Sequence, residues 1–376
     1  MAEYLTNTTD LTKVATSIRE KGGTSDLLVY PDGFVTAIQA IQTGTELQII
    51  VSVTSGATVT ATKGSNVVSG TSVNGTCTLV VPEAGTWSVK ATLNGQTSDT
   101  KSVTFTDSYA VTLSFVSAVL NDNDWATIKA VSDKGEGANY WSIGDRKAVT
   151  LNGTVGHLTL SNYTTYAFII GFNHNASVEG ANRIHFQLAK TALSGGTDVC
   201  FCDSKYISNV STTGYFSMNS SRTNSGGWAS SQMRTNICGT SLSSYSGTII
   251  AVIPAALRAV LKSVTKYTDN TGGTSTAESY VTATTDYFFL LSEFEVFGSI
   301  SYANSNESSK QAQYAYYSAG NSKIKYKHDG TSTAVYWWLR SPYASNSGGF
   351  VDVITGGTVN HGNAYSSIGF APGFCV

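Results

Sequence analysis

The segment Tyr336–Val376 reads YWWLRSPYASNSGGFVDVITGGTVNHGNAYSSIGFAPGFCV. It opens with an aromatic block, Tyr336–Leu339, and closes with a second apolar block, Ile368–Val376. Between the two blocks lie Tyr, Ser, Asn and Gly, the residues that adaptable recognition surfaces use. This order predicts a binding face held between two anchored strands.

The candidate ligand-binding residues all lie in this segment. Tyrosine supplies contact area at a low entropic cost, and Ser and Asn supply adaptable hydrogen bonds. Most of these residues have no evident role in a core, which favours a contact surface. The predicted contact set is Tyr343, Ser345, Asn346, Ser347, Phe350, Asp352, Asn360, His361, Asn363, Tyr365 and Ser366.

The centre of the segment predicts a β-hairpin over Gly349–Asn360, with its turn at Thr355-Gly356-Gly357. Alternation along the first strand places Phe350 and Asp352 on one face. We expect that face to meet the polar residues of neighbouring loops and to bind a ligand. A face that is merely solvated is the alternative.

Four residues are predicted to support the site. Trp337 and Trp338 could form a platform for stacking sugars, but adjacent tryptophans more often place one ring in the core and leave the other partly buried. Arg340 could bind an anion, although a structural donor to backbone carbonyls is the more common role for such a residue. With Pro342, these residues are expected to hold the contact face in place.

The composition excludes several classes of partner. The 376 residues allow two or three domains, with a formal charge of −2 and 13% charged residues. No cluster of Lys and Arg suits nucleic acid, and no apolar run reaches the roughly 20 residues of a membrane helix. The start MAEYLTNTTD has no basic and apolar regions of a signal peptide, which predicts synthesis in a cytoplasm.

The cysteines form no recognisable framework. Their number is odd, and Cys200-Phe201-Cys202 does not have the spacing of zinc ribbons or redox pairs. We therefore predict buried free thiols at Cys77, Cys200, Cys202, Cys238 and Cys375.

Residues 1–45 predict two short helices. Leu11–Ile18 carries apolar residues at helical spacing, with a cap at Thr9 or Asp10 and an end at Gly22-Gly23. A second run begins at Phe34 and ends at Gly44. Two such helices bury little by themselves, so we expect them to dock onto sister chains or a larger particle.

Residues 46–107 alternate apolar and polar side chains, as half-buried strands do. Asn74-Gly75 and Asn94-Gly95 are strong hairpin signals. The pattern predicts a small β-sandwich, immunoglobulin-like in the broad sense, that serves as a spacer; weak carbohydrate binding is the alternative.

Residues 108–376 predict one α+β domain with a large aromatic core. Tyr109–Phe115 reads as its first strand, and Asp124–Val131 and Ile253–Leu261 read as helices. Ser292 and Glu295 match a capping box.

The string LTKVATSIREKGGTSDLLVYPDGFVTAIQAI, residues 11–41, resembles an N-terminal module of tail proteins from phages and prophages of Gram-positive bacteria. The resemblance covers about forty residues. It implies attachment to a virion tail, with other tail proteins as partners.

A second resemblance covers nearly all of 120–376. Its strings, in order, are LNDNDWATIKAVSDKGEGANYWSIGDRKAVTL, FIIGFNHN, GGWASSQMRTNI, IPAALRAVLKSVTKYTD, YFFLLSEFEVFG and YWWLRSP…GFAPGFCV. They resemble a bacterial and phage domain with the C-type lectin-like fold that formylglycine-generating enzymes share. Proteins diversified by retroelements, such as the phage major tropism determinant, use the same fold.

This resemblance implies that variable residues cluster near the end of the domain, beside an anchoring aromatic block. One difference is that Ala371 precedes Pro372, where such domains commonly carry Arg-Pro. We expect the local support of the site to be loosened or rewired there. Diversification by a retroelement is a hypothesis, and the absence of an adenine-biased template repeat near the gene would exclude it.

An enzyme is the competing class, and the residues give it little support. The histidines are dispersed, and neither a G-x-S-x-G elbow nor a P-loop is present. We expect His174 to be a satisfied loop histidine, and the capping box accounts for Glu295 beside Glu293. Cys375 is solitary in its segment, whereas formylglycine-generating chemistry needs cysteines that act together. We predict no catalytic residue and no cofactor.

Calcium is the remaining question for a lectin-like fold. Asn121–Asp124 offers oxygen ligands, but it reads as a helix start with a cap. Asp352 is the only carboxylate in the C-terminal segment, so we predict no metal site.

Together these observations predict a receptor-binding protein of a phage tail, located in the virion. Its expected parts are an attachment module (1–45), an immunoglobulin-like spacer (46–107) and a C-type lectin-like domain (108–376). The expected partner is a protein or glycan on a bacterial host surface, bound by a homotrimer for avidity. The alternatives are a bacterial surface adhesin, a structural tail protein and an enzyme of the formylglycine-generating fold.

Overall fold

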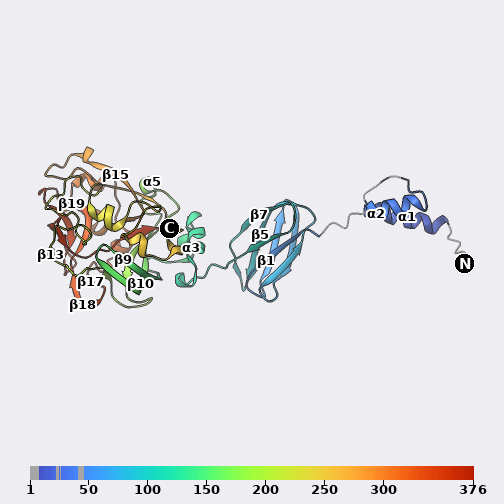
Figure 1. Ribbon diagram of the computed structural model, residues 1–376, viewed down its shortest axis with the longest axis horizontal. Helices are drawn as coiled ribbons and strands as arrows, with labels where there is room; N and C mark the ends of the chain where they lie inside the picture. The colour runs from blue at the N-terminus through green and yellow to red at the C-terminus, as the bar shows by residue number, and fades with distance from the viewer. Residues whose placement is uncertain (1–7, 23–24, 26, 41–45) are drawn as a thin grey trace. The chain divides into compact units, whose positions relative to one another are not determined.

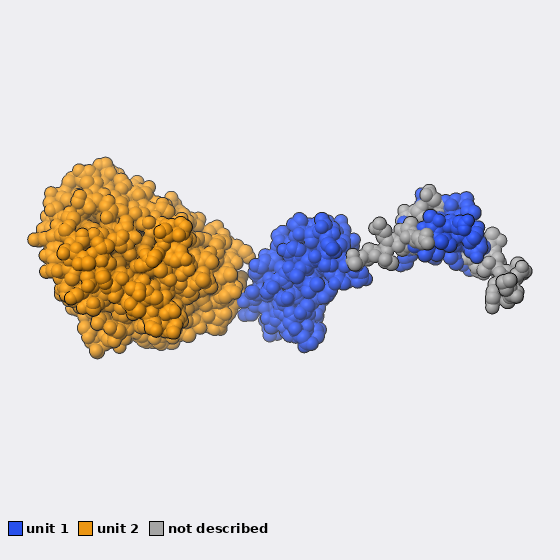
Figure 2. All heavy atoms as spheres, in the orientation of Figure 1, with its two compact units in different colours: residues 1–115 blue, residues 116–376 orange. Residues whose placement is uncertain are grey.

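The computed structural model describes residues 8–22, 25, 27–40 and 46–376 (Figure 1). The chain divides into two compact units, 1–115 and 116–376 (Figure 2). The protein is mainly β, and both units contain sheets. No helix among these described residues is both long and apolar enough to cross a membrane.

The two N-terminal helices are α1 (Thr8–Gly22) and α2 (Asp32–Ala40). They pack through a small core of Ala15, Ile18 and Phe34. Helix α1 already includes Thr9 and Asp10, which were predicted to cap it from outside. Helix α1 ends at Gly22, the first residue of the predicted Gly22-Gly23 end, whereas Gly23 and the predicted end of the second helix at Gly44 lie outside the described residues.

The rest of the first unit consists of two sheets that share one hydrophobic core around Trp87, Ile49 and Val59. The turns predicted at Asn74-Gly75 and Asn94-Gly95 have positive φ at both residues, as tight hairpins require. One sheet has the order β4–β1–β8, and the other has the order β3–β2–β5–β6 with β7 also on β5. The strands are β1 (Gln48–Ser52), β2 (Thr58–Lys63), β3 (Asn66–Thr71), β4 (Thr76–Val80), β5 (Gly85–Leu93), β6 (Gln96–Thr97), β7 (Lys101–Phe105) and β8 (Tyr109–Thr112).

Strand β8 lies in the first unit, although the sequence placed it at the start of the C-terminal domain. It pairs in parallel with β1, with Ile49 opposite Tyr109. A strand needs a partner for its backbone groups, and β8 finds that partner in the first unit. The compact units therefore meet at 115/116 instead of 107/108.

The C-terminal unit is built on a five-stranded sheet with the order β16–β23–β11–β10–β9. Strand β23 lies between β11 and β16, so a short strand near the end of the chain completes the sheet. These strands are β9 (Arg146–Val155), β10 (Leu158–Phe172), β11 (Ile184–Lys190), β16 (Phe288–Phe289) and β23 (Gly373–Cys375).

Smaller sheets surround it, with the orders β12–β17–β18, β13–β22, β14–β15 and β19–β20–β21. Their strands are β12 (Val199–Cys200), β13 (Ser208–Asn209), β14 (Val264–Asp269), β15 (Val281–Asp286), β17 (Lys325–Lys327), β18 (Gly330–Val335), β19 (Trp337–Pro342), β20 (Gly349–Val353), β21 (Val359–Asn363) and β22 (Ser366–Ser367).

The helices of this unit are short. They are η1 (Leu120–Asp122), α3 (Trp125–Asp133), α4 (Gly137–Tyr140), α5 (Ala176–Glu179), the π-helix η2 (Met233–Cys238), α6 (Ile249–Val252), α7 (Ala255–Arg258), η3 (Glu278–Tyr280), α8 (Glu293–Phe297), η4 (Ser305–Ser309) and α9 (Ala315–Ser318).

Two helix starts follow the sequence signals, and one predicted helix is shorter. Asp124 caps α3 by accepting from the Thr127 amide at 2.6 Å, and Ser292 forms the predicted capping box with Glu295. The helix predicted over Ile253–Leu261 is reduced to α7. Beyond α7 the Lys262 amide donates to the Cys375 carbonyl (2.9 Å), so the backbone there pairs with the end of the chain and not within a helix.

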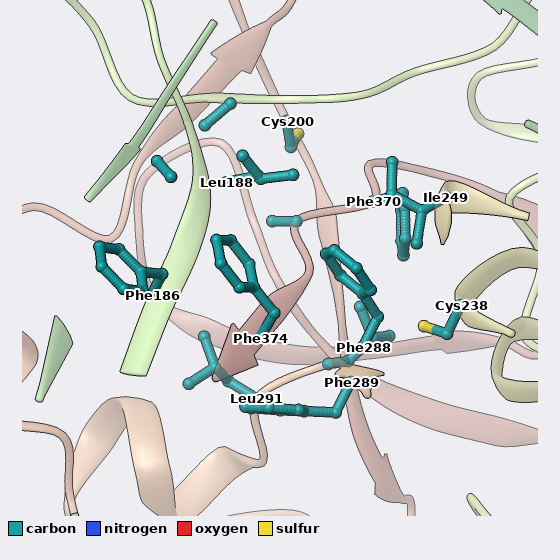
Figure 3. Close-up of a cluster of buried hydrophobic side chains, with 14 of the residues drawn as sticks. Phe186, Leu188, Cys200, Cys238, Ile249, Phe288, Phe289, Leu291, Phe370 and Phe374 are labelled. Carbon is teal, nitrogen blue, oxygen red and sulfur yellow. The ribbon is translucent and has the colours of Figure 1, made fainter. Parts of the chain in front are cut away.

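The core of the C-terminal unit is aromatic, as the sequence predicted. Phe186, Phe288 and Phe374 lie together beside the central sheet (Figure 3). The rings of Phe186 and Phe374 are stacked with centroids 5.2 Å apart, which adds to the free energy of burial. All five cysteines are buried and free, as predicted.

Candidate functional site

The candidate site is built on the sheet β19–β20–β21. Strands β20 and β21 form the predicted hairpin, and their pairing extends to Asn363, beyond the predicted end at Asn360. In this register Asp352 faces Asn360, and Phe350 faces Gly362. Trp338 of β19 lies opposite Asp352 on the other side. The register therefore places Trp338, Asp352 and Asn360 in one row across three strands.

A pocket of about 360 Å³ opens over this row. This volume lies in the range of small-molecule sites. Besides the row, the pocket is lined by apolar and polar groups from other parts of the chain. The full lining is Ile207, Tyr336, Trp338, Asp352, Asn360, His361, Gly362, Asn363, Ser366 and Ile368.

Asp352 is the buried polar group of the pocket. The residue is only 3% exposed, and its Oδ1 atom has no hydrogen-bond partner. Burial raises the pKa of the Asp352 carboxyl to about 7, and a hydrogen bond from Asn360 opposes that shift without cancelling it. A buried carboxyl without a full set of partners is costly, so a ligand that donates to it would regain free energy.

Ile207 forms part of the pocket wall in an unusual conformation. Its φ is 61°, a left-handed value that a β-branched side chain rarely adopts, and the side chain is 53% exposed. The Ile207 amide donates to the Ser367 carbonyl, which holds this segment against β22. Such strain is found more often where a structure positions a ligand contact than elsewhere.

An aromatic group lies beside the pocket, on the neighbouring part of the same face. The rings of Tyr343 and His361 are stacked with centroids 4.1 Å apart. Tyr302 meets both rings edge-on, at 5.6 Å and 5.0 Å. His361 also lines the pocket and is exposed, so it joins the two areas into one contact face.

The buried side chain of Asn224 holds the loop that joins β19 to β20 through hydrogen bonds. This residue is fully buried, and its Nδ2 donates to the carbonyls of Tyr343, Asn346 and Gly349 at 2.9–3.1 Å. Its Oδ1 accepts from the Gly273 amide at 2.9 Å. Ser345, Asn346 and Ser347 are exposed on this loop, as predicted for contact residues.

Replacement of Asn224 with alanine is expected to lower the free energy of unfolding by about 1–3 kcal/mol, because buried carbonyls lose their donor. Hydrogen exchange should rise at the amides of 343–349. Chemical denaturation and exchange mass spectrometry would measure both effects. Asn152→Ala, at an exposed position on β9, is the matched control. Equal effects of the two changes would show that Asn224 does not hold the loop.

The other predicted contact residues divide between the face and the core. Asn363 and Ser366 line the pocket, whereas Tyr365 is half-buried and does not line it. The Ser366 hydroxyl donates to Asn209 Oδ1 (2.8 Å). The prediction for Phe350 was wrong: its side chain is fully buried in the core, where a large apolar group gains the most free energy.

The predicted support residues are all buried. Both Trp337 and Trp338 are fully buried, which confirms a core position for at least one of them and leaves neither ring partly buried. Their indole N–H groups donate to the carbonyls of Lys323 (2.9 Å) and Phe216 (3.0 Å). Both rings are therefore buried without leaving an N–H group unpaired. Pro342 ends β19.

Arg340 is a structural donor, as predicted, and it also belongs to an ionic cluster. It donates to the carbonyls of Leu290 and Tyr267 and forms two hydrogen bonds with Glu295. Lys266 bridges Glu295 (2.8 Å) and Glu179 (2.7 Å). All of these charged groups are buried. This cluster lies under β19 and holds α5, α8 and β14 together.

His174 lies in the loop before α5, as predicted, but its ring is satisfied only in part, through a backbone hydrogen bond at Ala312. Its Nε2 atom has no hydrogen-bond partner, and its ring is stacked on Tyr314 with centroids 3.7 Å apart. Burial, with help from the positive charge of Lys266, lowers the pKa of His174 to about 3. The imidazole is therefore neutral.

A metal ion does not fit this cluster. Ligand atoms of His174, Glu179 and Glu295 do lie within 4.8 Å of one another. The ammonium group of Lys266, however, already contacts both carboxylates, and a divalent cation beside it would be repelled.

The fold also brings Cys375 next to a histidine, which its sequence neighbours could not reveal. Its Sγ lies 3.3 Å from Nδ1 of His185. Burial raises the pKa of the Cys375 thiol to about 12 and holds the pKa of His185 well below its usual value. A thiol and a neutral imidazole, both fully buried, lack the exposed thiolate that nucleophilic catalysis requires.

Residues 198–376 match the family model of a domain of unknown function, DUF6273. The DUF6273 match contains the whole pocket lining and Asn224. It excludes β9, β10 and β11, yet β23 pairs with β11 inside one sheet, so the matched segment relies on residues outside it. No curated protein matches the chain.

Proposed function

We propose that this protein recognises a ligand on a bacterial host surface, as a receptor-binding protein of a phage or prophage tail. The observation that carries the proposal is the pocket over Trp338, Asp352 and Asn360, where the Oδ1 atom of the buried Asp352 carboxyl has no hydrogen-bond partner. In this proposal residues 116–376 form a C-type lectin-like domain. The two sheets of the first unit form an immunoglobulin-like spacer.

The build of the contact face supports recognition rather than catalysis. Its side chains extend from paired strands over the buried ring of Trp338, and Asn224 fixes the adjoining loop. A face that is rigid before binding loses little entropy when a ligand arrives. The described groups of this face include a carboxyl, amides, hydroxyls and aromatic rings, which suit hydrogen bonding and stacking.

The N-terminal helices support attachment to other tail proteins or to sister chains. Several large apolar side chains of this segment are exposed, although it buries only a small core. Apolar surface of this kind is common where another protein docks. Those exposed residues are Val14, Leu27, Val29, Tyr30, Val35 and Ile38.

The full chain is expected to bind whole cells of some bacterial strains and not others. Changing Tyr343, His361 and Asn363 together to alanine should abolish this binding, because it removes the aromatic stack and part of the pocket rim. Binding would be measured by flow cytometry with labelled protein. A matched control changes the exposed pair Thr150 and Thr164 on β9 and β10 to alanine.

Strain-selective binding that the triple variant loses and the control keeps, with unchanged melting of both, would support the proposal. Equal binding by all three proteins would exclude this face as the receptor site. A failure of the wild-type chain to bind any strain in a broad host panel would count against receptor binding.

A further inference from the structure

The pocket combines an acidic group with aromatic walls and has no basic counterpart. No Lys or Arg lines it, and no ion pair among the described residues involves Asp352. Trp338 and Tyr336 line it as aromatic residues, and Ile207 and Ile368 add apolar contacts. Amides and a hydroxyl from Asn360, Asn363 and Ser366 complete the lining.

We propose that this pocket binds a primary ammonium group, carried on a polyhydroxylated ring such as an amino sugar of a host-surface glycan. The inference rests on the proposed function, since it names the chemistry of the same site. The ammonium group contacts the Asp352 carboxyl, and the ring hydroxyls contact the amide and hydroxyl groups of the rim.

A cation satisfies this pocket better than a neutral hydroxyl does. A hydroxyl would give Oδ1 one hydrogen bond but would leave a buried negative charge unpaired. An ammonium group supplies both the donor and the opposite charge, and such charge-assisted bonds are roughly twice as strong as neutral ones.

The other polar groups that line the pocket favour a ligand with a hydroxylated ring. A lysine side chain would present one ammonium group on a flexible apolar stem, and the groups of Asn360, Asn363 and Ser366 would gain nothing from that stem. A ring with several hydroxyls can pair with these groups at once. The volume of about 360 Å³ suits a compact group of this kind.

Binding of an ammonium group should depend on pH. The pKa of Asp352 in the empty pocket is raised to about 7, so the carboxyl must release a proton before it can pair with the cation at lower pH. His361 and Tyr336 are the other titratable groups that line the pocket, on β21 and at the start of β19. Burial lowers the pKa of His361, so this imidazole carries less positive charge beside the cation than a free histidine would.

The test compares two sugars that differ in one group. The full chain would be titrated by calorimetry with 6-amino-6-deoxyglucose and with glucose. A primary alkylamine is charged at both pH 6 and pH 8. With a carboxyl pKa near 7, the amino sugar should bind about tenfold more tightly at pH 8 than at pH 6. Glucose should bind at least tenfold more weakly than the amino sugar at pH 8 and change little with pH.

Two variants give the controls. Asp352→Asn keeps the shape of the side chain and should remove both the preference for the amino sugar and its pH dependence. The Thr150→Ala, Thr164→Ala protein should bind as the wild type does. Proton release, measured in two buffers of different ionisation enthalpy, should approach one proton for each amino sugar bound at pH 6 and should vanish in Asp352→Asn.

The outcomes separate this inference from the proposed function. Equal affinity for the two sugars, or no binding of either at millimolar concentration, would overturn the ammonium site even if the cells still bind through the contact face. Butylamine binding as tightly as the amino sugar would overturn the sugar ring and favour a lysine of a surface protein. Amino sugar binding that depends on Asp352, without selective cell binding, would retain the ammonium site and count against receptor binding.

Discussion

Replacement of Glu295 with alanine is expected to lower the free energy of unfolding of the C-terminal unit by about 3–5 kcal/mol. Glu295 is fully buried and pairs with both Arg340 and Lys266. These positive charges hold the pKa of Glu295 far below its usual value, against the opposite effect of burial, which is the largest single influence. Without the carboxylate, Arg340 would lose its ion pair, and Lys266 would be left with its ion pair to Glu179.

Urea denaturation followed by tryptophan fluorescence would measure this effect, because five of the six tryptophans lie in residues 116–376. Lys129→Ala is the control, since it breaks an exposed pair with Asp133, and such pairs contribute less than about 1 kcal/mol. Arg340→Met combined with Glu295→Ala should cost less than the sum of the single changes. Additive costs would mean that the two groups do not stabilise each other.

Asp352→Asn is expected to have the opposite effect and to stabilise the protein at pH 8. The folded-state pKa of about 7 lies above the ordinary value of 3.8. The folded state therefore holds its proton more tightly than the unfolded chain, and stability falls as the pH rises from about 4 to 7. At about 1.4 kcal/mol for each pH unit, the loss is at most roughly 4 kcal/mol. Asparagine cannot ionise, so the Asp352→Asn protein does not lose this stability as the pH rises.

The measurement compares the free energy of unfolding of the two proteins at pH 4 and pH 8. The difference between them should be small at pH 4 and reach several kcal/mol at pH 8. Burial also raises the pKa values of Glu179 and Glu307 to about 7, but both proteins contain these groups and their contributions cancel. A difference that does not change with pH would show that Asp352 is ionised normally in the folded protein.

Features that depend on near neighbours in the sequence could be predicted. The hairpin over β20 and β21 follows from alternation and from the Gly-rich turn, because both act within about ten residues. The caps at Asp124 and Ser292 need only a side chain and the amide three positions later. Asp352, Asn360, Asn363 and Ser366 were placed at the site for the same reason.

Features that depend on distant parts of the chain could not be predicted from the sequence. Ile207 reaches the pocket from a segment more than one hundred residues before the hairpin, and Asn224 supports the loop from a similar separation. The pairing of Cys375 with His185 depends on the order of strands in the central sheet. Phe350 was misplaced because alternation assigns a side chain to a face and does not show what covers that face.

The position of β23 between β11 and β16 has a consequence for synthesis. A ribosome synthesises β11 and β16 before it reaches residues 373–375. Until then, the backbone groups of these strands that pair with β23 have no partner. Open strand edges invite pairing with other chains, and contacts between distant segments slow folding. A message that stops before codon 373 yields a chain that contains every pocket residue but cannot close the sheet beneath them. Only chains translated through this strand can display the contact face on a finished scaffold.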